Sequence, residues 1–256
     1  MRFLNVVLPS LLVVQCCLAQ RVNESKQFEA RLRAARALLK EAPSNLLFCG
    51  DTGWQVDKAS KECRAALKLS PENSDALATM GAILYRKAMY GSGSKRNELF
   101  EQSKGFFRRA LQSDSKNVDA HEGIAEVFHM DLMQRMDESL RQKGMWMGQG
   151  RPLDPNAIPE GVRLAYRRDI DEAERHAQFK LSADRSAVSA MIVLANISRV
   201  RAYLAGSQEE FAVNMKEVES WQRKAQAVPR KPVATRACDM GGIIGAIPSQ
   251  APPPPK

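Results

Sequence analysis

The sequence predicts an all-α protein built from antiparallel helix pairs, on three observations. Aromatic residues make up only 6% of the chain, whereas the helix-favouring residues Ala, Leu, Lys, Arg and Glu are abundant. No stretch shows sustained alternation of apolar and polar residues, so no β-sheet is expected. A third observation is internal similarity between residues 61–85, 104–128 and 171–197. In each, a helix with an apolar face is followed by a short polar turn and a second helix.

The repeated pattern resembles the tetratricopeptide repeat, a helix–turn–helix unit of 34 residues. The matching positions are Ala59, Cys63, Ala66 and Pro71 in the first copy, Ser103, Phe107 and Ala110 in the second, and Ala173 and Ala177 in the third. The resemblance spans about residues 24–229 and implies a right-handed helical-repeat solenoid of about four antiparallel helix pairs. The chain departs from the family in its stretched spacing, since the intervals between Ala66, Ala110 and Lys180 are 44 and 70 residues.

Eight helices are predicted in chain order. They are 24–41 with 56–70, 74–90 with 97–113, 118–146 with 161–182, and 187–205 with 208–227. The extra length of the second pair is expected in the Gly/Ser loop "MYGSGSKRNE". The extra length of the third pair is expected in two lengthened helices joined by a proline-rich loop, with two short extra helices as the alternative. Gly81 and Ala125 are expected at equivalent positions of close helix contact.

The first nineteen residues differ from the rest of the chain. Arg2 is their one charge, an apolar run follows, and the segment ends in Cys17-Leu18-Ala19. This pattern is typical of a cleaved secretory signal peptide, which gives a mature start at Gln20. The prediction is therefore an exported protein, periplasmic or extracellular, with no stable membrane insertion after cleavage. The repeat domain would span residues 20–228.

Composition and motifs argue against several functional classes. The formal net charge is +9, but the basic residues are scattered among acidic ones instead of forming the stripe typical of a nucleic-acid site. The segment "HEGIA" has Ala125 where a zinc-protease helix has its second histidine, and "GSGSK" lacks the spacing of a phosphate loop. The chain has no C-x-x-C motif. The sequence therefore predicts no enzyme, no catalytic residues, no cofactor, no metal site and no nucleic-acid partner.

A methionine-rich segment, 129–147, holds five of the eleven methionines. Met130, Met133 and Met136 recur every three residues and share one face of a helix, with His129 beside them. Thioethers and imidazole are ligands for Cu(I) in an exported protein. Methionines also fill irregular gaps between helices, and this packing role is the favoured interpretation.

The tetratricopeptide resemblance implies a concave groove lined by the first helix of each pair. It places there Asp75, Ala78, Ala82, Tyr85 and Arg86, then Asp119, Glu122, Glu126 and His129, and finally Ser189, Ile192, Asn196 and Arg199. The groove is expected to be acidic in its middle and more basic toward its C-terminal end. Its expected ligand is a protein or peptide partner.

The chain ends in "GGIIGAIPSQAPPPPK". Residues 229–256 are predicted to be a disordered Gly/Pro-rich tail. The tail resembles the linker that precedes the C-terminal domain of some bacterial TonB-like proteins. The leading hypothesis is thus an exported, non-enzymatic scaffold that binds a protein or peptide in its groove. The alternatives are a truncated TonB-like envelope protein, whose repeats are a sensor or docking module, and a periplasmic Met/His copper-binding protein.

Overall fold

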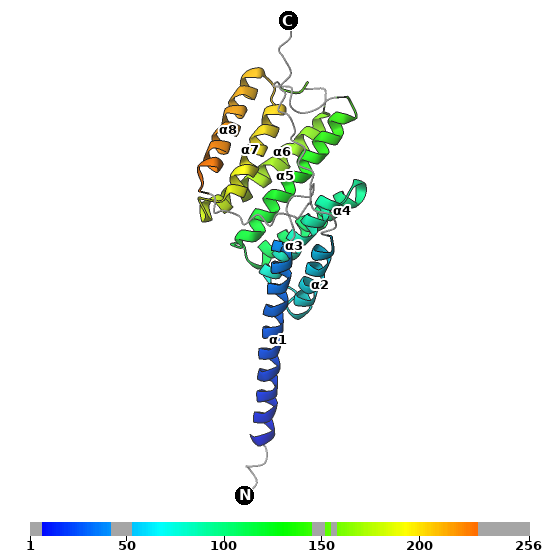
Figure 1. The fold of residues 1–256 in the computed structure, drawn as a ribbon, viewed down its shortest axis with the longest axis vertical. Helices are drawn as coiled ribbons and strands as arrows, with labels where there is room; N and C mark the ends of the chain where they lie inside the picture. The colour runs from blue at the N-terminus through cyan, green and yellow to red at the C-terminus, as the bar shows by residue number, and fades with distance from the viewer. Residues whose placement is uncertain (1–6, 42–52, 145–151, 155–157, 230–256) are drawn as a thin grey trace, which may run out of the picture.

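The computed structural model describes residues 7–41, 53–144, 152–154 and 158–229 (Figure 1). Within these residues the protein is built from α-helices with no strand, which confirms the predicted all-α class. The helices are α1 (Val7–Glu41), α2 (Gly53–Leu69), α3 (Ser74–Tyr90), α4 (Gly93–Ser113), α5 (Val118–Arg141), α6 (Glu160–Ala183), α7 (Val188–Tyr203) and α8 (Gln208–Ala227).

Consecutive helices pack as four pairs: α1 with α2, α3 with α4, α5 with α6 and α7 with α8. The odd-numbered helices also contact one another in order, from α1 to α3, α5 and α7. Each even-numbered helix from α2 to α6 contacts the odd-numbered helix that follows it. The predicted pairing is therefore confirmed, and the architecture is repeat-like.

The turns between pairs recur with the same hydrogen bonds, at intervals of 44 and 70 residues. The backbone N–H groups of Ser70, Asp114 and Asp184 each donate to the carbonyl four residues earlier, at 3.0, 2.8 and 2.9 Å. In the first two turns an Asn then caps the next helix. The Asn73 side chain accepts from the Ala76 N–H at 3.0 Å, and the Asn117 side chain from the Ala120 N–H at 2.8 Å.

Two helix boundaries differ from the prediction, since α4 begins earlier than expected and α5 ends earlier. The loop expected in "MYGSGSKRNE" is wrong, since only Gly91 and Ser92 separate α3 from α4. Gly93 begins α4 with a φ of 57°, a left-handed conformation that favours glycine and permits this short connection. In the third pair, α5 ends at Arg141 instead of residue 146, and α6 begins at Glu160. The described residues between them contain no helix, as the prediction of two lengthened helices requires.

Helix α1 is much longer than predicted and extends beyond the other helices (Figure 1). Among the side chains of α1 that the structure describes, those from Phe28 through Leu32 to Ala35 are buried against the core, at the spacing of one helix face. The predicted cleavage point after Ala19 lies inside this helix. In the part of the chain that is described, no helix combines the length and the apolar character needed to cross a membrane. Residues 230–256, which hold most of the predicted tail, lie outside the described residues.

A largely buried ionic cluster joins α4, α5 and α6; we call it the saturated cluster because each of its charged side chains has an ion-pair partner, although Arg135 Nε has no hydrogen-bond partner among the described residues. It consists of Lys104, Asp131, Arg135 and Asp169. The Lys104 ammonium lies 2.6 Å from Asp131 and 4.6 Å from the centre of the Phe128 ring. Arg135 pairs with Asp131 at 3.2 Å and with Asp169. Since the side chains of Lys104 and Asp131 are only 4% and 6% exposed, removing either charge would leave the other buried without this partner.

Candidate functional site

A pocket of about 360 Å³ opens between the odd-numbered helices α1, α3 and α5, with one side chain reaching it from α4. We call it the α1–α3–α5 pocket. Its volume lies in the range of about 300–1,000 Å³ that is typical of ligand sites. The residues that line it are Arg36, Leu39, Lys40, Ala78, Thr79, Ala82, Arg86, Phe107, Asp119, Glu122, Gly123 and Glu126.

The Phe107 ring forms the floor of this pocket because two glycines leave space for it. A Cβ atom on Gly123 would lie 2.1 Å from the ring, and one on Gly81 would lie 2.9 Å from it. Both distances are shorter than Cβ contacts in folded proteins, so a side chain at either position would force the ring to shift. Gly81 thus occupies the predicted position of close contact. On α5 the same ring meets Gly123, while Ala125, 44 residues after Gly81, is buried in the core at the predicted equivalent position.

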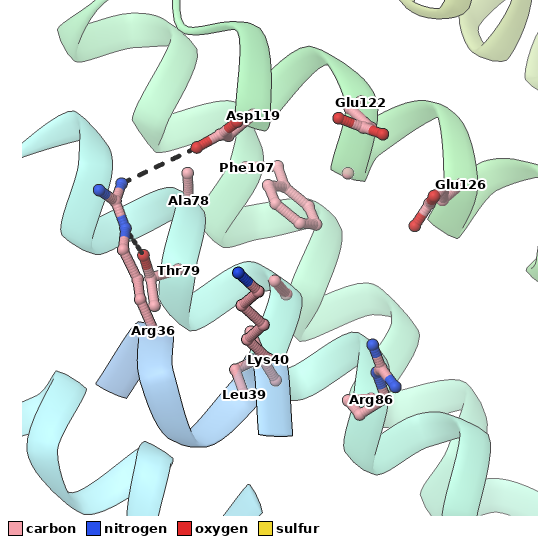
Figure 2. A pocket seen from close by; sticks show the side chains of 12 residues that line it. Arg36, Leu39, Lys40, Ala78, Thr79, Arg86, Phe107, Asp119, Glu122 and Glu126 are labelled. Carbon is pink, nitrogen blue, oxygen red and sulfur yellow. Dashed lines mark hydrogen bonds and ion pairs between the residues drawn. The ribbon is translucent and has the colours of Figure 1, made fainter. Parts of the chain in front are cut away.

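The two sides of the pocket carry opposite charges. Figure 2 shows Arg36, Lys40 and Arg86 along one side, contributed by the C-terminal part of α1 and by α3. Asp119, Glu122 and Glu126 follow one face of α5 along the other side, with the Phe107 ring between the two rows. We call these rows the basic wall and the acidic wall.

At one end of the pocket, Arg36 joins the two walls. Its guanidinium lies 3.4 Å from the Asp75 carboxylate and 3.8 Å from the Asp119 carboxylate, and Nε donates to Thr79 Oγ1 at 3.2 Å. All three charged side chains are well exposed, so these ion pairs contribute little to stability. A charged ligand could therefore replace these ion pairs of Arg36 at small energetic cost.

Toward the other end, Glu122 and Glu126 differ in how they are compensated. Lys180 from α6 lies 2.6 Å from the Glu122 carboxylate, which also accepts a hydrogen bond from the Ser189 hydroxyl. The half-buried Glu126 side chain forms no hydrogen bond or ion pair with any residue that the structure describes. Its pKa is raised to about 7, first by burial and then by the Glu122 carboxylate, against the opposing effects of Arg86 and Lys180.

The structure brings six of the thirteen predicted groove residues into the pocket: Ala78, Ala82, Arg86, Asp119, Glu122 and Glu126. The three carboxylates predicted for the middle of a groove therefore line this pocket together.

The other seven predicted residues lie outside the pocket lining. Ser189 on α7 donates a hydrogen bond to Glu122, and Ile192 is exposed on the same helix. Asp75 is at the rim, held by Arg36 and by the Asn117 amide, which donates to its carboxylate at 3.1 Å. Tyr85 is half-buried near Glu126, and burial followed by the Glu126 charge raises the pKa of its hydroxyl. Asn196 and Arg199 contact each other on α7, where the Arg199 guanidinium donates to the Asn196 amide oxygen at 2.8 Å.

His129, the last of these residues, is a buried side chain on α5. It is 7% exposed, and its Nε2 atom has no hydrogen-bond partner among the described residues. Burial, followed by the positive charge of Arg199, lowers its pKa to about 4. The expectation of a groove-facing histidine is wrong, since the ring is buried and is absent from the pocket lining.

The sequence interpretation missed the contribution of α1 and α4. Arg36, Leu39 and Lys40 belong to the first helix of the first pair, which the resemblance also places on the groove face. Extending the same helical register to that pair would have found them. Phe107 was recognised only as a packing position. The signal for its second role was the pair of glycines on the helices that flank it.

The methionine-rich segment supports the packing interpretation. Met136 is fully buried in the main core, and Met130 and Met133 pack against that core. Among the described residues, no group of three or more His, Cys, Asp or Glu side chains is arranged to hold a metal ion. Cys63 is a buried free thiol whose pKa burial raises to about 12, so it is a poor nucleophile and a poor metal ligand.

Comparisons with known proteins leave the family open. No protein-family model matches the chain, and no curated protein shows significant similarity to it. The tetratricopeptide resemblance therefore stays a prediction drawn from the residues, and the α1–α3–α5 pocket is the feature on which a function can be argued.

Proposed function

We propose that this protein is a non-enzymatic helical-repeat scaffold that binds a segment of a protein partner in the α1–α3–α5 pocket. The observation that carries the proposal is an open pocket with an aromatic floor between two rows of opposite charge. Aromatic and arginine side chains in a partly enclosed pocket are typical of positions that contribute most to protein binding. Repeat proteins also commonly bind partners on the surface that stacked repeats create.

The arrangement in the pocket favours binding over catalysis. Lys180 and Arg36 already compensate Glu122 and Asp119. The described lining residues include no histidine, serine or cysteine, and their one aliphatic hydroxyl, that of Thr79, donates to the Asp75 carbonyl oxygen at 2.7 Å and accepts from Arg36 Nε at 3.2 Å. Export remains part of the proposal, as does the tetratricopeptide-like register. Neither is needed for the pocket to act as a binding site.

A selection from a random peptide display library tests the proposal. Peptides selected on the wild-type protein are measured by fluorescence anisotropy against Glu122→Lys/Glu126→Lys and against the matched control Glu217→Lys/Glu219→Lys. The control makes the same charge change on the exposed surface of α8. We expect the pocket variant to lower affinity at least tenfold and the control to leave it unchanged. Equal effects of the two variants, or no selectable peptide, would contradict the proposal.

A further inference from the structure

The charges in the α1–α3–α5 pocket have a regular spacing that restricts the kind of segment it fits. Arg36 and Lys40 are four residues apart on α1, and Glu122 and Glu126 are four residues apart on α5. Four residues of α-helix advance about 6 Å along the axis. Each wall therefore presents two like charges separated by about one helical turn.

An extended peptide matches this spacing. Alternate residues of a β-strand lie about 6.4–6.8 Å apart and project from the same face, while the intervening residues project from the opposite face. A strand lying over Phe107 would direct one set of side chains to the acidic wall and the other set to the basic wall. An α-helix is about 10–12 Å wide with its side chains, which is large for a pocket of about 360 Å³.

We propose that the pocket binds an extended segment in which acidic and basic residues alternate, with its basic side chains on Glu122 and Glu126 and its acidic side chains on Arg36 and Lys40. The inference rests on the proposed function and specifies its partner.

Incomplete pairing in the pocket supports this assignment. Glu126 forms no ion pair with a described residue, and the same holds for Lys40 at the facing wall. The groups that act on Glu126 are Glu122, Tyr85, Arg86 and Lys180. Burial, followed by the effects of these groups, leaves its carboxyl with a pKa of about 7, so the ionised form is poorly compensated. A basic side chain of the segment would supply the missing charge. The apolar stems of Lys and Arg can cover the Phe107 ring.

Fluorescence anisotropy with three labelled peptides tests the inference: an alternating (Lys-Glu)₄ octapeptide, octalysine and octaglutamate. Measurements at 50, 150 and 500 mM salt separate pocket binding from general attraction to a chain with a net charge of +9. At 150 mM salt we expect the alternating peptide to bind at least tenfold more tightly than either homopolymer.

Charge reversal of the walls gives the sharpest readout. Arg36→Glu/Lys40→Glu and Glu122→Lys/Glu126→Lys should each weaken binding of the alternating peptide at least tenfold. The quadruple variant should restore it to within about threefold of wild type, because an alternating peptide shifted by one residue faces the exchanged walls correctly. Circular dichroism checks that each variant is folded. The milder Lys40→Gln and Glu126→Gln should each weaken binding about threefold if a reversed variant does not fold.

The outcomes separate this inference from the proposed function. Equal or tighter binding of a homopolymer at 150 mM salt would overturn the alternating-charge inference. So would a quadruple variant that binds no better than the double variants. If library-selected peptides bind in the pocket but show no charge alternation, only this inference fails. If no peptide binds in the pocket, the proposed function fails with it.

Discussion

The two charged clusters of α5 lie on different faces of the helix and have different consequences. The saturated cluster contains Lys104, Asp131 and Arg135, each of which is within ion-pair distance of an oppositely charged group. The acidic wall instead faces an open pocket and contains Glu126, which no described residue pairs. The number of charged side chains therefore does not distinguish a binding site from a structural element. The α1–α3–α5 pocket is distinguished by its open volume and by charged side chains that have no ion-pair partner among the described residues.

The largest expected difference between the clusters concerns the loss of one carboxylate. Asp131→Ala leaves the Lys104 ammonium buried with only the exposed Glu101 at 2.8 Å. We expect it to lower the free energy of unfolding by about 3 kcal/mol, because a buried unpaired charge is costly. Asp119→Ala on the acidic wall should change it by less than about 0.5 kcal/mol, since that carboxylate is exposed.

Urea unfolding followed by circular dichroism at pH 7 measures both variants. The double variant Lys104→Met/Asp131→Leu should recover most of the loss, because it removes both buried charges together. Similar effects of Asp131→Ala and Asp119→Ala would mean that the two clusters do not differ in the way described.

The second prediction concerns the floor of the pocket. Gly123→Ala places a methyl group against the Phe107 ring and should lower the free energy of unfolding by ~1–3 kcal/mol. The matched control is Gly105→Ala, on an open surface of α4 with no atom within 4 Å of the added Cβ. The control should be stabilising by up to ~1 kcal/mol, since alanine favours helices more than glycine does.

The opposite signs make this comparison decisive for the packing of Phe107. In a Phe107→Leu background, the cost of Gly123→Ala should shrink, because the smaller side chain leaves room for the methyl group. If Gly123→Ala is as stabilising as the control, the ring does not pack between α3 and α5 as described.

The third prediction uses the raised pKa of Glu126, which is about 7 in the folded protein. As pH rises above the ordinary value of about 4.5, the unfolded state ionises while the folded state holds its proton, so stability falls until about pH 7. Glu126→Gln lacks this loss. Relative to wild type, the variant should gain about 2 kcal/mol in unfolding free energy between pH 5 and pH 8. A pH-independent difference between the two proteins would show that Glu126 is not the poorly compensated carboxyl of the pocket.

The histidine pair between α5 and α6 should make stability depend on pH in the opposite direction to Glu126, and substituting it should cost less at pH 7. The Nδ1 atoms of His121 and His176 are 2.7 Å apart, and the His121 ring stacks on Phe179 at 3.7 Å. Burial, followed by the charge of His121, lowers the pKa of His176 to about 4. The folded state therefore favours the neutral ring, and this contribution is lost as pH falls from about 6.5 toward 4.

The variant His176→Gln tests this contribution. At pH 7 we expect it to lower the free energy of unfolding by about 0.5–1.5 kcal/mol, the usual net value of one hydrogen bond. By pH 4.5 the wild type should have lost about 2 kcal/mol that the variant does not lose, so the variant should then be at least as stable as the wild type. Thermal unfolding at both pH values measures it, and a variant that falls further below the wild type at pH 4.5 would contradict the account.

Much of the fold was predictable because its signals are local. The apolar faces of the helices and the Asn73 and Asn117 caps follow from short stretches of sequence, and the pairing followed once the repeat was recognised. The start of α4 was less predictable, since the glycines of "MYGSGSKRNE" predict a loop whereas α4 begins at Gly93 within that stretch.

The site was only half predictable because it depends on contacts between distant segments. Asp119, Glu122 and Glu126 share a face by helical spacing alone, and they do line the pocket. The position of Phe107 depends on Gly81 and Gly123 in two other helices. The burial of His129 depends on how α5 packs, which its own neighbours in the sequence do not specify.

The central claim is that partners bind at the α1–α3–α5 pocket and not at the saturated cluster. Amide chemical-shift mapping with a library-selected peptide tests it most directly. The account predicts dose-dependent shifts for residues around Lys40, Ala82 and Glu126, and unchanged resonances around Lys104 and Asp169. Shifts centred on the saturated cluster, or on α8, would contradict it.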